Sequence, residues 1–551
     1  MNGIKLMYIA KSRSKSASGK EYESILLRES YRDGGKVKNR TIANLSKHSK
    51  DEIRAIDLAL KNKSNHKLLS SESFQIQQGR SVGSVIVLQR IAEKLGIIKA
   101  LGNSFHAKLA LWLIIARIIE QGSRLSAARL DTTYDIASII GLKRGFDEND
   151  LYESLHWLTT NQPDIEDSLF KQVQHSGNFY WYDVTSSYFE GMKNALAAYG
   201  YNRDKKKRKK QIVIGLLTIN NGMPISIEAF KGNTQDTQTF ESQLNKLKTR
   251  FGCEKVTIVG DRGMIRKKQK KIVHEYGFEY ITALSLPEIT SLLKAKLLNL
   301  DDFGSELRSI YHKGVRYIYR RNLNRAAETQ QQRHERLETA QRHIDQENKR
   351  LKLKSDASIE KAEIRMGKYL KRLCISEWAY IFVNGRELEL KINSEKLQER
   401  AKFDGCYVWT TEISSDEIND REVYERYKDL KYVEDDFRTI KTNFLEVRPI
   451  HVRTPQSTKG HLVVTLLAYM IVRELRKAWH DQQLTVQEGV KLLSLICHNK
   501  VQCSDGIAIE MISTPTPEAE KLLSALKIKM PKTIHETKIC VVTRHKVKSK
   551  T

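Results

Sequence analysis

The chain has 551 residues, and 94 Lys and Arg against 66 Asp and Glu give it a formal net charge of +28. Its 40% hydrophobic content is that of a folded protein, which excludes a disordered tail or a coiled rod. The positive excess favours a polyanionic partner, because each neutralised phosphate releases counterions, although a merely basic protein remains the alternative.

Three further classes are disfavoured. The first residues lack the apolar core of a signal peptide, so we expect none. The most apolar runs, 109–119 and 462–472, are too short to cross a bilayer and predict core helices, so we expect no membrane partner. The six cysteines form no CxxC pair, which favours reduced thiols over a zinc site.

The N-terminal 175 residues predict two segments. Residues 1–75 are β-rich, and Asp33-Gly34-Gly35 separates two alternating runs, which is typical of a hairpin. Residues 76–176 follow a helical pattern with an apolar helix over 107–120. We predict that this helical domain binds DNA, although bundle packing explains its pattern equally well.

Residues 177–289 predict the first part of an α/β core. Its strands and helices alternate as in a mixed sheet covered by helices. The expected strands are 178–186, 211–219, 223–230, 255–260 and 278–284, and the expected helices are 236–250 and 263–276.

The remaining chain predicts three segments. Residues 290–413 form an insertion that is β-rich but also carries two charged helices. Residues 414–480 return to the core, and 481–551 form a C-terminal basic region.

Two aspartates lie in segments that otherwise predict buried strands. Asp183 stands in Tyr-Trp-Tyr-Asp-Val-Thr, and Asp261 ends the run Val-Thr-Ile-Val-Gly-Asp. A buried carboxylate without a partner is costly, so two of them at strand positions indicate a cation.

A third acid lies on a predicted amphipathic helix over 424–444. Apolar residues recur there at i, i+4, i+7 and i+11 from Val433, and Glu434 lies at the margin of that stripe. Tyr427 and Lys441 stand seven residues before and after Glu434, so the helix presents all three along one face. The insertion lies between Asp261 and Glu434 in the chain, and we expect it to form a wall of their cleft.

Simpler explanations of these acids stay open. Asp183 could cap a turn through Thr185, and Asp261 could form an Asp-Arg-Gly turn. Asp435 and Asp436 are rival acids beside Glu434, but they point further from its line.

Together these motifs resemble the acidic triad of DDE transposases from bacterial insertion sequences. The resemblance is to the branch with a large insert before the Glu and a Tyr-x6-Glu-x6-Lys signature, here Tyr427, Glu434 and Lys441. It extends over roughly residues 20–530. Further matching stretches are Gly232-Asn233-Thr234-Gln235-Asp236, Arg448-Pro449-Ile450-His451 and Gly460-His461.

This resemblance implies an α/β fold: an RNase H-like mixed sheet with flanking helices, interrupted by the insertion and preceded by the β-hairpin and helical domain. It implies that Asp183, Asp261 and Glu434 are catalytic and hold two Mg²⁺ ions, for which Mn²⁺ can substitute. The enzyme would bind the terminal inverted repeats of its element, cut double-stranded DNA and join its ends to a target. It would act as a homodimer in the bacterial cytoplasm, associated with the nucleoid. A nuclease without strand transfer and a catalytically idle DNA-binding protein are the alternatives.

The expected DNA contacts are basic and aromatic. The family signature carries an Arg three residues after the Tyr, and here Leu430 takes that position with Lys431 beside it. A basic run before the second core strand also predicts phosphate contact, with a solvated loop as the alternative. The predicted DNA-binding residues are Tyr427, Lys431, Lys441, Lys205, Lys206, Lys207, Arg208, Lys209 and Lys210.

Overall fold

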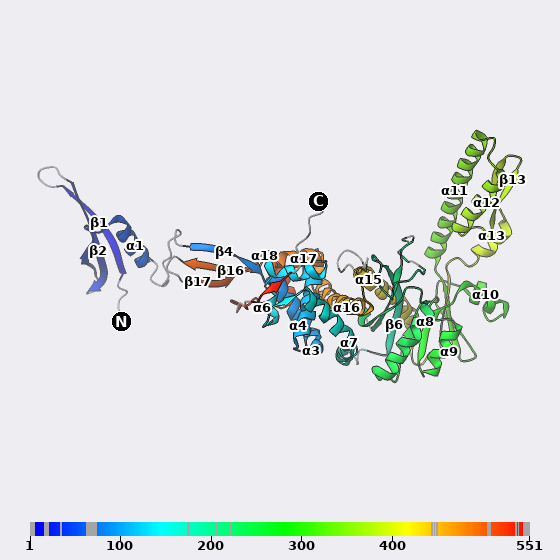
Figure 1. Cartoon of the computed structure of the whole chain (residues 1–551), viewed down its shortest axis with the longest axis horizontal. Coiled ribbons are helices and arrows are strands. Elements are labelled where there is room, and N and C mark those ends of the chain that lie inside the picture. The colour runs from blue at the N-terminus through cyan, green and yellow to red at the C-terminus, as the bar shows by residue number, and fades with distance from the viewer. Residues whose placement is uncertain are drawn as a thin grey trace. The chain divides into compact units, whose positions relative to one another are not determined.

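The chain divides into two compact units (Figure 1). One comprises Met1–Gly79 and His498–Ile512, and the other Arg80–Cys497 and Ser513–Thr551. The finer division into six segments stays a prediction. The computed structural model describes residues 6–15, 21–33, 36–61, 74–173, 177–201, 203–204, 206, 208–219, 222–441, 445, 447, 450–503, 508–534, 537 and 539–543.

The smaller unit is built on two three-stranded sheets. The first sheet is antiparallel, in the order β1-β2-β3. Strands β2 and β3 form the predicted hairpin, which is therefore confirmed, and β1 adds a third strand. Gly34 and Gly35 of the predicted turn lie outside the described residues. The second has the order β17-β16-β4. The elements are β1 (Leu6–Lys15), β2 (Glu21–Asp33), β3 (Lys36–Asn44), α1 (Lys50–Lys61), β4 (Phe74–Ser81), β16 (Cys497–Cys503) and β17 (Ala508–Ile512).

The larger unit begins with a helical layer around α4, the expected apolar helix. Nearly all of α4 is buried, and Trp112 ties it to α5 by donating from Nε1 to the Ala127 carbonyl at 2.8 Å. Helix α16, also largely buried, packs against α4 and α7. The elements are α2 (Gly83–Lys94), α3 (Ile97–Leu101), α4 (Phe105–Ile119), α5 (Arg124–Arg129), α6 (Ile136–Ile140), β5 (Phe146–Asp147), α7 (Glu148–Val173), α16 (Pro455–Ala478), α17 (Val486–Leu493), α18 (Pro517–Ala525) and β18 (Val541–Val542).

The second half of the larger unit is built on a mixed sheet with helices on both faces. Strands β8, β7 and β6 run antiparallel, and β9 and β10 follow parallel to β6. This order and these directions are those of an RNase H-like fold, which confirms the expected fold class. Helices α8 and α9 cover one face of the sheet, and α15 and α16 contact its other side. The elements are β6 (Phe179–Tyr188), β7 (Gln211–Ile219), β8 (Met223–Lys231), α8 (Asp236–Asn245), β9 (Thr257–Val259), α9 (Lys267–Glu275) and β10 (Glu279–Ala283).

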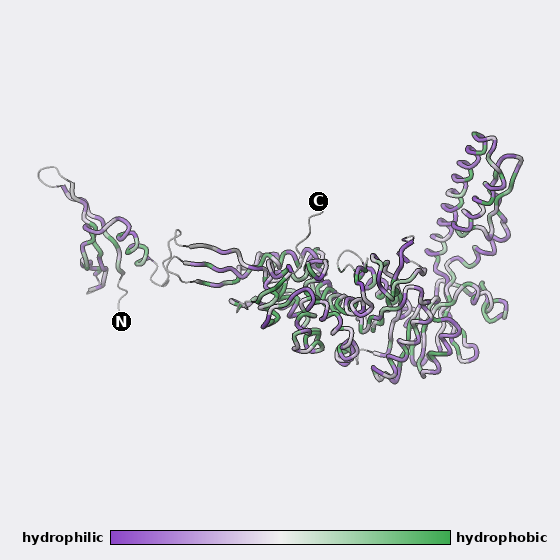
Figure 2. The backbone as a smooth tube through the Cα atoms, viewed as in Figure 1, coloured by the Kyte–Doolittle hydropathy of each residue, from purple (hydrophilic) through white to green (hydrophobic). Residues whose placement is uncertain are grey.

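Part of the insertion continues this same sheet. Strands β15, β12 and β11 extend it antiparallel beyond β10, giving eight strands in the order β11-β12-β15-β10-β9-β6-β7-β8. Between β12 and β15 a helical arm projects, with its own small core around Ala340, Leu370 and Trp378. Its outer residues are mostly hydrophilic (Figure 2). The elements are α10 (Leu286–Lys294), β11 (Arg308–His312), β12 (Val315–Arg321), α11 (Leu323–Leu353), α12 (Ile359–Arg372), β13 (Ala379–Asn384), β14 (Glu387–Ile392), α13 (Ser394–Ala401) and β15 (Cys406–Thr411).

The single amphipathic helix expected over 424–444 is wrong. The structure has two helices, α14 (Asp420–Lys428) and α15 (Leu430–Lys441), separated at Asp429. In a continuous helix the Arg426 carbonyl would accept from the Leu430 N–H. Here the indole Nε1 of buried Trp181 donates to that carbonyl at 2.8 Å, and the chain turns.

Within the described part of the chain, none of the helices combines the length and apolar character needed to span a membrane.

The contact of α16 with α7 generates a stability prediction. A Cβ added at Gly460 would lie 2.1 Å from the Leu155 carbonyl oxygen. Gly460→Ala should therefore destabilise the larger unit by about 1–3 kcal/mol, because the two backbones must separate. In the matched control Gly367→Ala, on α12, a Cβ meets nothing within 4 Å, and better helix propensity should stabilise by about 1 kcal/mol. Denaturant unfolding gives the free energy of unfolding of both variants. Equal changes in the two variants would contradict the close approach of the α16 backbone to that of α7 at Gly460.

Candidate active site

Asp183 lies on the central strand β6 and is placed by the alternation of that strand. Tyr180, Tyr182 and Val184 point into the core beneath α8 and α9. Asp183 therefore faces the opposite side, where α15 contacts β6. Its Oδ1 accepts a hydrogen bond from the Val184 N–H at 2.7 Å, so the turn through Thr185 is not its local partner.

Asp261 follows the short buried strand β9 and sits in the turn considered above as its simpler explanation. Its Oδ1 accepts from the N–H groups of Gly263 at 3.0 Å and Met264 at 2.7 Å. Both bonds use the same carboxylate oxygen. The Asp-Arg-Gly turn is thus present, and it fixes the backbone from which this acid projects.

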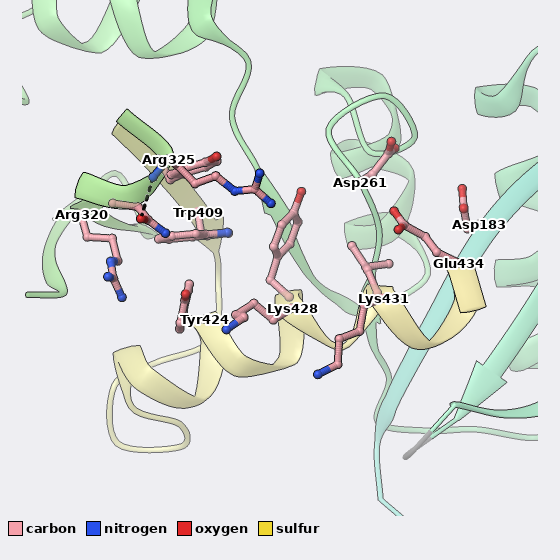
Figure 3. Close-up of a pocket in the computed structure, with 13 residues that line it drawn as sticks. Asp183, Asp261, Arg320, Arg325, Trp409, Tyr424, Lys428, Lys431 and Glu434 are labelled. Atoms are coloured by element: carbon pink, nitrogen blue, oxygen red, sulfur yellow. Dashed lines mark hydrogen bonds between the residues drawn. The ribbon is translucent and has the colours of Figure 1, made fainter. Parts of the chain in front are cut away.

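Glu434 lies in the first half of α15, on its exposed side. The helix is anchored by buried Val433 and Phe437, which flank the glutamate in sequence. Figure 3 shows the Glu434 and Asp183 side chains close together, with Asp261 above them on its loop. The two neighbouring acids, Asp435 and Asp436, interact with other side chains. Asp436 is buried and accepts a hydrogen bond from the Tyr469 hydroxyl, and Asp435 forms an ion pair with Arg438 at 3.0 Å.

The electrostatics confirm that the three acids share one environment. Burial, together with the nearby charges of Asp261 and Glu434, raises the pKa of Asp183 to about 7, against the lowering effects of the Val184 N–H and Arg203. Burial, with Asp261 and Glu434 adding to it, raises the pKa of Tyr427 to about 12, so this phenol stays protonated at neutral pH.

The donor set fits a hard divalent cation, because carboxylate oxygens are the ligands Mg²⁺ prefers. The side chains of Asp183, Asp261 and Glu434 do not yet surround one common position for an ion. Among the residues that the structure describes, no three His, Cys, Asp or Glu side chains are already arranged to hold one ion. Asp261 Oδ1 accepts from its own loop, so Oδ2 is the oxygen of this carboxylate that these two hydrogen bonds leave for a metal ion.

The three acids line one cleft of about 340 Å³, and the insertion supplies its opposite wall (Figure 3). Strands β12 and β15 and the start of α11 carry these wall residues. The expectation that the insertion forms a wall of the cleft is therefore confirmed. From the insertion come Arg320, Asn322, Arg325, Tyr407 and Trp409, and from α14 and α15 come Tyr424, Tyr427, Lys428, Leu430, Lys431 and Glu434.

The arginines and the tryptophan of this wall were not predicted from sequence. Two of their donors, Arg320 Nε and Trp409 Nε1, are buried without a hydrogen-bond partner in the described structure. The Arg320 guanidinium lies over the Tyr424 ring, 5.3 Å from its centre. No spacing rule links Arg320 to Glu434, which follows more than a hundred residues later, so only the sheet order could have revealed them.

The predicted DNA contacts divide between the cleft and the segment before β7. Tyr427 and Lys431 line the cleft, whereas Lys441 does not: its Nζ lies 3.2 Å from Asp204 Oδ1, and both side chains are largely buried. Lys209 pairs with Glu190 at 2.8 Å. Lys206, Arg208 and Lys210 are on the same connection, and Lys205 and Lys207 lie outside the described residues.

The raised pKa of Asp183 predicts a pH-dependent stability. Because burial raises the folded pKa of Asp183 above its usual value of 3.8, the carboxyl group opposes folding least below pH 3.8, and its cost grows as pH rises to about 7. Asp183→Asn should thus raise the thermal midpoint at about pH 8 and raise it less at about pH 5. Burial also raises the pKa of Asp436 to about 7, so part of the pH dependence of stability remains in the Asp183→Asn variant. Thermal unfolding at both pH values tests this; an equal shift at both would contradict the burial argument.

Comparison with known proteins agrees with this geometry. Residues 9–71 match the model of the IS1634 family transposase N-terminal domain, and residues 173–471 match the transposase DDE domain. No curated protein matches the sequence. Among solved structures, a cryo-EM piggyBac transposase synaptic complex with hairpin DNA aligns at 9% identity and a TM-score of 0.35, covering 75% of this chain and 76% of that chain. DDE transposase domains are generally dependent on divalent metal ions. The DDE domain model covers more than half of the chain, and the protein belongs to the DDE transposases, with an N-terminal domain of the IS1634 type.

Proposed function

We propose that this transposase cuts the ends of its element and joins their 3′-hydroxyls to target DNA in the cleft of Asp183, Asp261 and Glu434. The observation that carries the proposal is that three acids from separate elements line one cleft and perturb the pKa of Asp183. Groups with such shifts in a cleft are typical of functional sites. The reaction is a phosphoryl transfer on DNA.

Asp183, Asp261 and Glu434 would hold two Mg²⁺ ions, with Mn²⁺ as a substitute. When bound, the metal supplies Lewis acidity to the attacking and leaving oxygens of the displacement at phosphorus. Asp183 must release its proton to become a ligand, and Asp261 would bind through Oδ2 while its Oδ1 keeps the Gly263 and Met264 N–H groups. The neutral Tyr427 phenol can then donate a hydrogen bond to a phosphate oxygen at the same cleft.

Arg320 and Arg325 would bind the DNA phosphate in place of the signature arginine, whose position in this chain is occupied by Leu430. Both line the cleft from the insertion side, opposite α15 (Figure 3). A guanidinium binds phosphate through a planar fork, which Lys431 cannot reproduce. The unpartnered Nε of Arg320 supports this role, because a buried donor needs an acceptor and a phosphate oxygen supplies one.

The other parts of the chain would serve DNA binding. We propose that the N-terminal β-rich segment and the helical domain bind the terminal inverted repeats, and that the basic connection of Lys206, Arg208, Lys209 and Lys210 follows the DNA backbone. Lys441 would act through Asp204, whose Oδ2 accepts from the Tyr188 N–H at 3.1 Å and so fixes this connection beside β6. Two copies would act together because two ends must meet, on the nucleoid in the bacterial cytoplasm.

The acidic triad is tested by Glu434→Gln, which keeps the shape of the side chain. A plasmid carrying the gene and its flanking DNA should lose excision and reinsertion by more than about 100-fold, since even the outer partners of metal ligands are worth about 10–100-fold. Mg²⁺ should raise the thermal midpoint of the wild type and not of the variant. Asp435→Asn is the matched control and should retain both.

Three results would contradict parts of this proposal. Full mobility of Glu434→Gln would mean that another acid acts. Cleavage by the wild type without joined products would indicate a nuclease. DNA binding by a wild type that neither cuts nor responds to Mg²⁺ would indicate an idle DNA-binding protein.

The wall arginines are tested by Arg320→Gln and Arg320→Lys. Loss of the guanidinium should lower strand transfer by about 10- to 100-fold, which corresponds to the ~1.5–3 kcal/mol of a hydrogen bond to a charged group. Arg320→Lys should recover only part of the rate, because it restores the charge without the fork. Arg308→Gln, an exposed position on neighbouring β11 outside the cleft, is the control. Equal rates for Arg320→Gln and this control would exclude the role.

A further inference from the structure

A second, larger cavity lies among the helices and away from the acids. It has a volume of about 900 Å³ and is lined by residues from the N-terminal halves of α5, α7 and α16, by Arg117 near the end of α4, and by the segments that precede α5 and α16. None of its lining residues lines the cleft of Asp183, Asp261 and Glu434. The proposed reaction therefore makes no use of it.

The inner wall of this cavity is basic and buried. Arg117 and Arg124 are 6% and 8% exposed, and each donates from Nη2 to the Gly122 carbonyl at 3.3 Å. His461 is 4% exposed. Two donor or acceptor atoms of this wall, Arg124 Nε and His461 Nδ1, have no hydrogen-bond partner in the described structure. The buried Arg124 guanidinium therefore needs a further acceptor for its Nε.

The rim of the cavity is also basic. His156, His451 and Arg453 line it and are exposed. His156 Nε2 lies 2.8 Å from Ser457 Oγ, which joins the start of α7 to the first turn of α16. Helix α16 is 24 residues long, and its N-terminal N–H groups and dipole favour an anion at this end.

Acidic side chains compensate this charge poorly. Among the lining residues, Glu148 is the one acid. Burial lowers the pKa of His461 well below its usual value, and the charges of Arg117, Arg124 and His451 lower it further. The cavity wall thus carries a positive charge, and a purely structural role would leave the buried Nε of Arg124 without an acceptor.

We propose that this cavity binds a phosphate group of the DNA backbone, at a site separate from the catalytic cleft. A phosphodiester carries an acceptor oxygen for Arg124 Nε and the negative charge that Arg453 on the rim attracts. The site is joined to the catalytic sheet, because Ile450 N–H donates to the Tyr188 carbonyl at the end of β6 and His451 follows directly. DNA held here is therefore anchored to the strand that carries Asp183. The proposal depends on the DNA substrate of the proposed function but not on its three carboxylates.

The test measures the affinity of the full chain for two fluorescent duplexes of unrelated sequence, over a series of salt concentrations. Arg453→Glu on the rim should weaken binding to both duplexes by about tenfold and lower the slope of log K against log salt by about 1, as expected for a lost phosphate contact. Arg124→Gln should act in the same direction. Arg129→Glu, an exposed change on the same helix as Arg124 but outside the cavity, should leave affinity and slope close to wild type.

A calorimetric titration with inorganic phosphate separates the two sources of the anion. Weakened DNA binding in the cavity variants supports a backbone phosphate. Phosphate binding that Arg124→Gln abolishes, with DNA affinity unchanged, would overturn it in favour of a free anion. Variants indistinguishable from Arg129→Glu in both titrations would also overturn it. Arg453→Glu is on the surface, so the test stands even if Arg124→Gln fails to fold. Neither titration requires DNA cleavage, so its outcome is separate from that of the acidic triad.

Discussion

The burial of Asp183 beside two further acids, Asp261 and Glu434, is the constraint on which the rest of this structure depends. Taking this carboxylate out of water opposes folding, the neighbouring charges add to the cost, and the raised pKa of Asp183 records it. The surrounding packing must therefore hold the three acids in place. Strand β6 is an interior strand of an eight-stranded sheet, β9 lies beside it, and the buried side of α15 fixes the position of Glu434. A cation that binds all three converts the repulsion into attraction.

The insertion is part of this arrangement. Because β12 and β15 are strands of the catalytic sheet, Arg320 and Trp409 stand in fixed register with Asp183 through continuous backbone hydrogen bonds. The cleft thus has an acidic wall for a metal and a basic, aromatic wall for nucleic acid. Asp183 and Arg320, on the two walls, are more than a hundred residues apart in the chain, yet one sheet carries both.

Much of the core was predictable, because β-branched and aromatic runs such as 211–219 indicate strands before any tertiary contact is considered. The two aspartates and the glutamate were predictable from the same local patterns together with family resemblance. The break at Asp429 was not, since it depends on Trp181, which is 245 positions from Arg426 in the chain. The wall arginines and the second cavity depend likewise on long-range pairing: Arg124 and His461 meet only once α5 and α16 have packed. The periodicity of apolar residues along a short segment contains no information on such long-range contacts.

Helix α11 begins in the cleft, where Asn322 caps it and Arg325 lies one turn inside, and it continues for 31 residues. Arg333 holds it against the sheet by pairing with Asp404, just before β15. Each residue turns a helix by about 100°, so a single insertion or deletion ahead of Arg325 would swing its guanidinium out of the cleft. Beyond Arg333 the same change would only alter the length of the arm. Natural variation in length, and any engineered fusion, should therefore be tolerated at the outer end of α11 and excluded from its first three turns.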